Sequence, residues 1–374
     1  MTVYLDYNAT TPVLPEVADL VYKMMVDEYG NAGSRTHEYG VNAKRAVENA
    51  RAQVALVANA DKNEVIFTSG ATESNNIAIL GMREFAEKSG KKHIITSKIE
   101  HKAVLEPIAY LEQLGFSVTY LDVTPEGGVD TEHLKTSLRE DTILVSIMHV
   151  NNETGSIQPL DEVCQLLTGH DAYLHVDAAQ SFGKYSFGLE NPRIDFISVS
   201  GHKLYAPKGI GALIARRRNF IKPPLTAIYF GGGQEKGLRP GTLATPLIAG
   251  LGLACELANV NSDKWIKHVS TLKNEFINNL KEFGALVNGS YTSPYVLNFS
   301  IPGINSEAAM VQLKGIIAVS NGSACTSSSY NPSHVLVAMG LNRERIDGSI
   351  RVSFGANTKN IPYQDIQKKL KALL

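Results

Sequence analysis

The chain has 374 residues, of which 44% are hydrophobic and 20% are charged, and its formal net charge at pH 7 is −1. These values describe a soluble globular protein with room for one large domain and one smaller domain. The near balance of charge excludes a general attraction to nucleic acid or to an anionic membrane surface. The sequence has no basic-then-apolar leader and no apolar run of about 18 residues, so we expect a cytoplasmic protein.

The predicted elements begin with a polar, turn-rich segment, residues 5–12, and a helix that Pro15 can open. A long amphipathic helix is expected over residues 37–58. From residue 65 onward strand-like and helical runs alternate, which predicts a mostly parallel sheet with helices on both faces. The strand-like runs are residues 65–67, 93–96, 117–121, 143–150, 173–177, 195–200 and 210–215. The last two have little room for a helical crossover, so we expect one antiparallel strand.

The remainder of the chain reads as a smaller α/β unit. Arg216-Arg217-Arg218 is interpreted as a solvated turn, and the glycine-rich residues 230–242 as a flexible loop whose arginine and hydroxyl groups would also suit an anion. Helices are expected over residues 248–257 and 263–283, and strands near residues 296–300, 316–320 and 349–354.

A lysine, Lys203, follows one strand-like run and precedes the glycine-rich segment Pro207-Lys208-Gly209-Ile210-Gly211. An ammonium buried at the end of a strand loses its hydration, so it must be paired, neutral or covalently bound. A lysine with a lowered pKa forms an imine with an aldehyde, and pyridoxal phosphate is the common aldehyde cofactor. A surface lysine on a turn is the alternative.

Two further segments supply the other parts of the same cofactor site. Asp177 ends an apolar strand, where its carboxylate could keep a pyridine nitrogen protonated or could cap the next helix. The segment Ser69-Gly70-Ala71-Thr72 reads as a tight turn between a strand and a helix, and a helix N-terminus suits a phosphate, with the Thr72 hydroxyl as an additional donor. Together the three segments predict a pyridoxal phosphate site.

Ligands of such sheets collect at the carboxyl ends of the strands, and Gly70, His101, Asn152, Asp177 and Lys203 all follow strands. His101 is a candidate to stack on the cofactor ring and to move protons, although a histidine in this position is often structural. The amide of Asn152 could hold a phenolic oxygen or a carboxylate, with turn formation as the alternative.

Three cysteines are too few and too scattered for a disulfide framework or a closed zinc site. Cys164 and Cys255 lie among apolar helical residues and should pack as small hydrophobes. Cys325 is flanked by glycine, serine and threonine, so we expect it on an exposed, mobile loop from which its sulfur can reach a substrate. Arg351 lies in a strand-like run, where a guanidinium could hold a carboxylate or simply occupy the face of the strand.

The combined motifs resemble those of the NifS/IscS-type cysteine desulfurases, which are related to class V aminotransferases, and the resemblance covers essentially the whole chain. The motifs are Tyr4-Leu5-Asp6-Tyr7-Asn8-Ala9-Thr10-Thr11-Pro12, Ser69-Gly70-Ala71-Thr72-Glu73-Ser74-Asn75-Asn76, Glu100-His101-Lys102-Ala103-Val104, Val150-Asn151-Asn152-Glu153-Thr154-Gly155, His175-Val176-Asp177-Ala178-Ala179-Gln180, Ser200-Gly201-His202-Lys203 and Gly322-Ser323-Ala324-Cys325-Thr326-Ser327.

The resemblance implies the type I fold of pyridoxal-phosphate-dependent transferases. Its large domain, residues 13–246, would hold a mostly parallel sheet of about seven strands, and residues 1–12 together with 247–374 would form a smaller α/β domain that carries the cysteine loop. The implied cofactor contacts are Lys203 as the Schiff-base lysine, Asp177 on the pyridinium nitrogen, Gln180 on the phenolic oxygen, His101 stacked on the ring, Asn152 beside it, and Ala71, Thr72, Ser200 and His202 around the phosphate, with Thr242 reaching in from the second subunit of a homodimer.

The implied reaction converts L-cysteine to L-alanine. Asn152 and Arg351 would bind the substrate carboxylate, Lys203 and His101 would transfer protons, and Cys325 would take the sulfur as a persulfide and pass it to an acceptor protein. That acceptor is open between an iron–sulfur scaffold, a tRNA thiolation enzyme and a DNA sulfur-modifying system. Only 19 residues follow Gly355, whereas members that serve iron–sulfur assembly often carry a longer tail that binds the scaffold.

Three alternative functions remain at this point. A selenocysteine lyase would also release alanine but would prefer selenium. A β-eliminating C–S lyase of the same fold would release pyruvate and ammonia, and it would not need Cys325. A platform that mainly binds sulfur-trafficking partners, with catalysis incidental, is the third alternative, and the intact set of Lys203, Asp177 and His101 argues against it.

Overall fold

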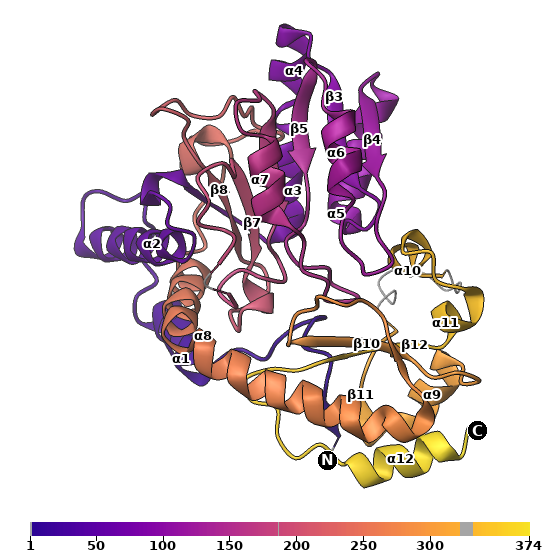
Figure 1. Ribbon diagram of the computed structural model, residues 1–374. Helices are drawn as coiled ribbons and strands as arrows, with labels where there is room; N and C mark the ends of the chain where they lie inside the picture. The colour runs from indigo at the N-terminus through magenta and orange to yellow at the C-terminus, as the bar shows by residue number, and fades with distance from the viewer. Residues whose placement is uncertain (1, 186, 322–331) are drawn as a thin grey trace.

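A seven-stranded sheet is the centre of the computed structural model, which describes residues 2–185, 187–321 and 332–374 (Figure 1). Its strand order is β2-β8-β7-β6-β5-β3-β4. Strand β8 runs in the opposite direction to the other six strands. The strands are β2 (Val65–Thr68), β3 (His93–Ser97), β4 (Ser117–Leu121), β5 (Thr142–Ser146), β6 (Tyr173–Asp177), β7 (Phe196–Ser200) and β8 (Gly211–Ala215).

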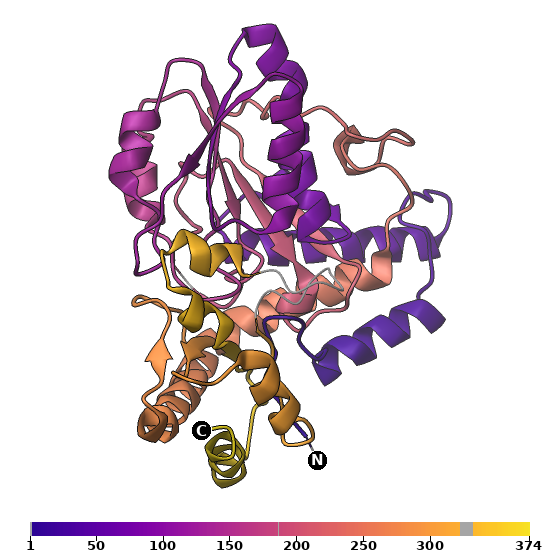
Figure 2. The same ribbon diagram turned by 90° about the vertical axis from the view of Figure 1, so that its right-hand side faces the viewer.

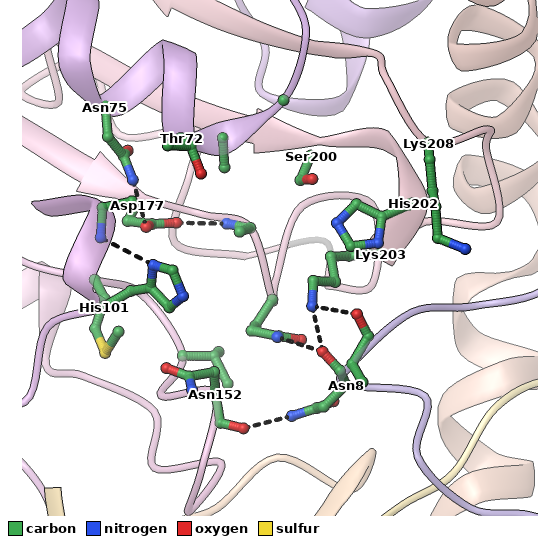
Figure 3. Close-up of a pocket in the computed structure, with 18 of the residues that line it drawn as sticks. Asn8, Thr72, Asn75, His101, Asn152, Asp177, Ser200, His202, Lys203 and Lys208 are labelled. Atoms are coloured by element: carbon green, nitrogen blue, oxygen red, sulfur yellow. Dashed lines mark hydrogen bonds between the residues drawn. The ribbon is translucent and has the colours of Figure 1, made fainter. Parts of the chain in front are cut away.

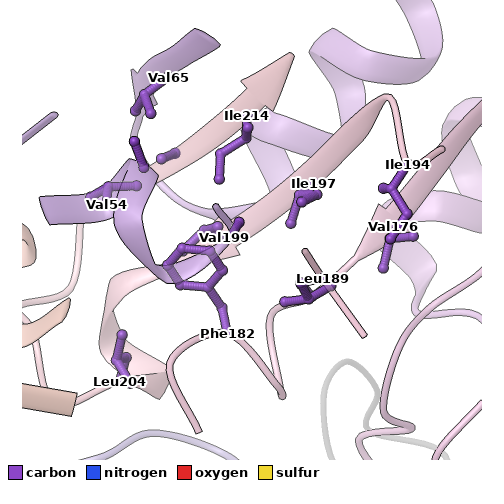
Figure 4. Close-up of a cluster of buried hydrophobic side chains, with 14 of the residues drawn as sticks. Val54, Val65, Val176, Phe182, Leu189, Ile194, Ile197, Val199, Leu204 and Ile214 are labelled. Carbon is purple, nitrogen blue, oxygen red and sulfur yellow. The ribbon is translucent and has the colours of Figure 1, made fainter. Parts of the chain in front are cut away.

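Successive side chains of a strand point to opposite faces of the sheet, and here both sets include buried apolar side chains. Helices therefore cover both faces. Ile66 of β2 packs in a cluster with α3, α4 and α5, whereas Val65 and Phe67 pack on the other side, where α2 and α8 lie. Figure 4 shows part of that second cluster, in which Val54 of α2 lies near Val65 and Ile214 of the sheet.

The helices around the sheet enter in chain order. They are α1 (Pro15–Val26), α2 (Glu38–Val57), α3 (Ala71–Leu80), α4 (Arg83–Ser89), α5 (Lys102–Gln113), α6 (Thr131–Ser137), α7 (Leu160–Leu166) and α8 (Thr245–Leu280). Proline opens α1, and the side chain of His37 accepts a hydrogen bond from the backbone N–H of Gly40 at the start of α2. Within the described residues, no helix combines the length and apolar character needed to cross a membrane.

A second group of strands lies at the carboxyl-terminal side of the molecule (Figures 1 and 2). The antiparallel strands β9 (Leu286–Val287), β10 (Val296–Ser300) and β12 (Ser349–Ser353) form one sheet, and β1 (Val3–Tyr4) pairs with β11 (Ile317–Ala318) in parallel. The remaining helices are α9 (Ser306–Leu313), α10 (His334–Ala338), α11 (Arg343–Asp347) and α12 (Tyr363–Lys371). The start of the chain therefore lies beside elements that are more than 300 residues away in sequence.

The predicted alternation of strands and helices is confirmed, including the single antiparallel strand. Two predicted boundaries are wrong. The strand expected over residues 143–150 ends at Ser146, and the two helices expected over residues 248–257 and 263–283 form one 36-residue helix, α8. Residues 258–262, which lie between those two runs, include neither proline nor glycine, so nothing there terminates a helix.

The interpretation of Arg216-Arg217-Arg218 as a solvated turn is also wrong. Arg216 follows the buried strand β8 and is only 7% exposed. Its guanidinium donates to the backbone carbonyls of Asn191 (2.6 Å), Ile194 (3.2 Å) and Leu189 (2.7 Å), and also to that of Ala58. The side chain joins the end of α2 to the segment between β6 and β7, and the acceptor residues Ala58, Leu189 and Ile194 are buried.

Replacing Arg216 with methionine should therefore destabilise the fold. The Arg216→Met variant leaves several buried carbonyls without a donor, and we expect the free energy of unfolding to fall by about 3 kcal/mol. Denaturant titration followed by circular dichroism measures this change. The neighbouring Arg217→Met variant is the matched control, and equal losses in the two variants would contradict the assigned role of Arg216.

Candidate active site

A cavity of about 690 Å³ opens at the carboxyl ends of the strands of the large sheet, between that sheet and the strands of the carboxyl-terminal group (Figure 3). This size suits a cofactor together with a small substrate. Of the residues predicted for the site, those that line the cavity are Ala71, Thr72, His101, Asn152, Asp177, Gln180, Ser200, His202, Lys203 and Arg351. Cys325 lies outside the described residues, and Thr242 lies elsewhere in the fold.

One end of the cavity is formed by the N-terminus of α3. Gly70 precedes this helix with φ of 155° and ψ of −179°, a backbone conformation that is essentially restricted to glycine. A Cβ atom on Gly211 of the adjacent strand would lie only 2.6 Å from Cα of Gly70, so both positions need glycine. The first N–H groups of the helix, at Ala71 and Thr72, have no acceptor within the helix and line the cavity, as an anion-binding site requires.

His202 lies at the same end of the cavity and is uncharged at neutral pH. Burial, with the positive charges of Lys203, Lys208 and Lys184, lowers the pKa of His202 to about 4. Its Nδ1 atom lies 3.1 Å from the hydroxyl oxygen of Thr10. A neutral imidazole can therefore donate one hydrogen bond to an anion without adding a further charge.

Asp177 ends β6 and is only 5% exposed. One carboxylate oxygen accepts from Nδ2 of Asn75 at 2.8 Å, and the other accepts from the backbone N–H of Ala179 at 2.9 Å. Asn75 is a polar residue on the buried face of α3, and the sequence reasoning assigned it no separate role. These two donors fix the direction of the carboxylate toward the cavity (Figure 3).

The amine of Lys203 points toward the N-terminal segment of the chain. It donates to the backbone carbonyl of Asn8 and, at 2.8 Å, to that of Ala9. Nε2 of Gln180 donates to the same carbonyl of Asn8 at 3.1 Å. The sequence predicts residues 5–12 only as a polar, turn-rich segment, but two of their carbonyls hold the predicted Schiff-base lysine directly.

His101 is the N-cap residue of α5, and its Nδ1 atom accepts a hydrogen bond from the backbone N–H of Ala103 at 3.1 Å. This contact leaves Nε2 as the atom that carries the proton of the neutral ring. The preceding Glu100 is fully buried, and burial raises the pKa of its carboxyl group to about 8. Glu100 is therefore protonated at neutral pH, and one of its oxygens accepts from the backbone N–H of Met148 at 2.8 Å.

Arg351 of β12 also lines the cavity. Its guanidinium donates to the backbone carbonyl of Asn152 at 2.9 Å and pairs with the carboxylate of Asp6 at 2.8 Å. The side-chain amide of Asn8 donates to the same carbonyl of Asn152 at 3.1 Å. The sequence placed Arg351 at a carboxylate site but did not reveal Asp6 as its partner, because no spacing connects residues 345 positions apart.

The glycine-rich loop docks on the outside of the site through two ion pairs. Arg239 pairs with Glu73 of α3 at 3.0 Å, and Glu235 pairs with the buried Arg51 at 2.6 Å. Thr242 belongs to a separate cavity that also contains Asn31 and Gln234. In this subunit Thr242 is thus not brought together with the other predicted phosphate contacts.

The cavity contains buried polar atoms that need partners. Within the described residues, an oxygen of each of Asn8, Asn75 and Gln180 and the Nε atom of Arg351 are buried without a hydrogen bond, and all four residues line the cavity. Buried polar atoms of folded proteins are normally satisfied, so a polar ligand is expected there. The helix terminus, the Asp177 carboxylate and the Lys203 amine suit the phosphate, the pyridine nitrogen and the aldehyde of pyridoxal phosphate.

Comparison with known proteins agrees with this site. Residues 3–366 match the family described as aminotransferase class-V. The cysteine desulfurase IscS of Vibrio vulnificus strain YJ016 is 47% identical over 363 residues, which are 96% of this chain and 89% of that protein. The chain belongs to the cysteine desulfurase family.

Solved structures support the same relationship. A NifS-like protein superimposes with a TM-score of 0.90 at 37% identity over 100% of this chain and 98% of that one. SspA, solved in complex with cysteine, gives a TM-score of 0.83 at 37% identity over 96% and 100% of the two chains. The predicted type I fold, the pyridoxal phosphate dependence and the enzymatic desulfurase function are thereby confirmed.

Near the site, Lys184 is 3% exposed, and its Nζ atom lies 5.3 Å from the centre of the Tyr295 ring. Burial, together with the charge of Lys203, lowers the pKa of Lys184 to about 7. The unfolded chain keeps this lysine protonated up to about pH 10.5, so the folded state binds fewer protons and its stability rises with pH above about 7.

The Lys184→Met variant should remove that pH dependence. We expect its unfolding temperature at pH 7 to exceed that of the parent by roughly 2–4 °C, with a smaller rise between pH 7 and pH 9. Calorimetry of the cofactor-loaded protein measures both quantities. The exposed Lys135→Met variant is the control, and parallel pH curves for parent and Lys184→Met would show that Lys184 keeps an ordinary pKa.

Proposed function

We propose that the cavity converts L-cysteine to L-alanine and passes the sulfur through Cys325 to an acceptor protein. The observation that carries this proposal is the convergence, in one cavity, of a lysine amine, an oriented carboxylate, a helix N-terminus and a guanidinium. Each of these groups suits a different part of the cofactor or of an amino acid substrate. The bound cysteine of SspA, a relative of known structure, supports the choice of substrate.

The proposed cofactor contacts follow from chemical complementarity. Pyridoxal phosphate supplies a reactive aldehyde and a ring that accepts electrons. Lys203 would attach to the aldehyde, and Asp177 would hold a proton on the ring nitrogen. Gln180 and Asn152 would contact the ring substituents, while His101 would lie against the ring face. The phosphate would accept hydrogen bonds from Ala71, Thr72, Ser200 and His202.

Arg351 and Asn152 would hold the substrate carboxylate. With the carboxylate fixed, the amine of Lys203 is placed to receive the proton from the α-carbon of the substrate. Nε2 of His101 carries a proton that it can exchange with the substrate thiol, because its Nδ1 atom is occupied by Ala103. These two residues divide the proton transfers between them.

The sulfur transfer needs no external oxidant. The thiolate of Cys325 would attack the sulfur of the substrate, an S–S bond would form, and the C–S bond would break with its electron pair left on carbon. Protonation of that carbon gives alanine, and Cys325 is left as a persulfide. The acceptor that receives this sulfur would be an iron–sulfur scaffold, a tRNA thiolation enzyme or a DNA sulfur-modifying system.

We also propose the predicted division into residues 13–246 and residues 1–12 with 247–374. Two separate hydrophobic clusters support it, since Val17 belongs to the cluster of the large sheet and Leu5 to that of the carboxyl-terminal strands. Helix α8 joins the two, because Leu251 packs in the first cluster and Phe276 in the second.

The product formed from L-cysteine tests the proposed reaction. With a thiol reductant present, we expect the parent to release alanine and sulfide, and the Cys325→Ala variant to lose sulfide release by at least about a hundredfold while it keeps the absorbance of the lysine-bound cofactor. Amino acid analysis and a sulfide assay measure these products. The Cys164→Ala variant, which removes a buried helical cysteine, is the matched control.

Other products would contradict the proposed reaction and would identify one of the alternative enzymes. Pyruvate and ammonia, or full sulfide release without Cys325, would identify a β-eliminating lyase. A strong preference for selenocysteine, with selenide release that does not need Cys325, would identify a selenocysteine lyase.

A homodimer in which Thr242 completes the site of the partner subunit is part of this proposal. Support comes from the position of Thr242, which is exposed and lies outside the main cavity of its own subunit. Mixed dimers of Lys203→Ala and Thr242→Asp subunits test it. If Thr242 acts across the interface, one site of each mixed dimer is intact, so mixing should restore activity that neither variant has alone. If Thr242 acts within its own subunit, mixing should restore nothing.

A further inference from the structure

The ion pair between Asp6 and Arg351 places a fixed negative charge beside the carboxylate subsite. The two side chains meet at 2.8 Å, Arg351 is 5% exposed, and both residues line the cavity. Under the proposed function Arg351 binds the carboxylate of the substrate, and Asp6 has no part in that reaction. The carboxylate of Asp6 stabilises the buried charge of Arg351 before the substrate binds. It must also change the affinity of Arg351 for the carboxylate of a ligand.

The backbone holds Asp6 firmly in this position. The N–H of Ser353 donates to the carbonyl of Leu5 at 2.8 Å, and the N–H of Asn8 donates to the hydroxyl of Ser353 at 2.9 Å. The hydroxyl of Tyr4 donates to the carbonyl of Asp6 at 2.9 Å. Residues on both sides of Asp6 are thus tied to β12, the strand that carries Arg351, so the pairing is part of the fold.

The guanidinium of Arg351 still has an unused donor. One terminal nitrogen donates to Asn152 and the other to Asp6, whereas Nε is buried and has no hydrogen-bond partner among the described residues. Nε and the nitrogen bound to Asp6 lie on the same edge of the planar group. A ligand carboxylate that binds this edge with both oxygens takes the Nε–H group and an N–H group of the same nitrogen that binds Asp6, so it lies close to the negative charge of Asp6.

Two carboxylates on one guanidinium repel each other. At separations of about 4 Å, the interaction between two unit charges corresponds to roughly a fivefold effect on affinity in water and to a much larger one in a partly buried site. The unused Nε atom attracts the ligand, and Asp6 opposes part of that attraction. Asp6 thereby limits the affinity of the subsite for any carboxylate.

We propose that Asp6 sets the affinity of the carboxylate subsite and thereby promotes release of the amino acid product. Alanine carries the same carboxylate and α-carbon as cysteine, so tight binding by Arg351 alone would retain the product as well as the substrate. The proposal rests on the proposed function of Arg351. Asp6 contacts Arg351 and not the reacting atoms, so it acts on the affinity for the ligand carboxylate through the arginine.

The Asp6→Asn variant removes the negative charge of the side chain and keeps its size and shape. Its side-chain oxygen can still accept from Arg351, so the guanidinium stays in place while the negative charge is lost. We expect the dissociation constant of L-alanine for the cofactor-loaded enzyme to fall about tenfold. L-alaninamide, which has no carboxylate, should bind parent and variant equally. Unchanged or weaker alanine binding, or equal tightening of both ligands, would overturn the proposal.

Three further variants complete the design. Asp141→Asn removes an exposed carboxylate that pairs with Arg139, and it should leave alanine binding unchanged. Arg351→Met should weaken alanine binding in the parent background, and if it does not, the proposed role of Arg351 fails independently of Asp6. Asp6→Ala removes the charge with a different side chain, so it tests the same effect if Asp6→Asn does not fold. Tighter binding of alanine but not alaninamide is expected again, and its absence would contradict the proposal.

Discussion

Burial of charge at the carboxyl edge of the large sheet is the constraint on which the rest of the structure depends. Asp177 and Arg351 are each at most 5% exposed, and a buried charge is tolerated only when hydrogen bonds or an opposite charge replace its water. Neutral donors from Asn75 and Ala179 satisfy Asp177. Because these partners do not neutralise the carboxylate, its negative charge remains available to a cofactor.

The N-terminal segment supplies hydrogen-bond acceptors for two cationic side chains of the site, Lys203 and Arg351. Carbonyls of Asn8 and Ala9 receive the lysine amine, and Asp6 receives the arginine. Strand β1 is anchored by parallel pairing with β11, so this short segment is held in place by the opposite end of the chain. The site is consequently assembled only when both ends of the protein have folded together.

The sequence predicted the parts of this molecule that local chemistry determines. Strand–helix alternation, the glycine turn at Gly70 and the positions of His101, Asp177 and Lys203 after strands could all be read from short segments. Contacts between distant segments could not be predicted in this way. The ion pair of Asp6 with Arg351 and the hydrogen bond from Lys203 to the carbonyl of Asn8 therefore appeared only in the structure. The burial of Arg216 was missed because three consecutive arginines look like surface residues until the carbonyls around one of them are known.

Helix α8 has a mechanical consequence. It runs without interruption for 36 residues, contacts the core of the large sheet with its first half and reaches the cluster of the carboxyl-terminal strands with its second half (Figure 1). A continuous hydrogen-bonded helix without proline in its interior resists bending, and it therefore acts as a rigid strut between the two sheets. A change in the angle between the sheets would require this helix to slide or to bend, so α8 opposes such a change.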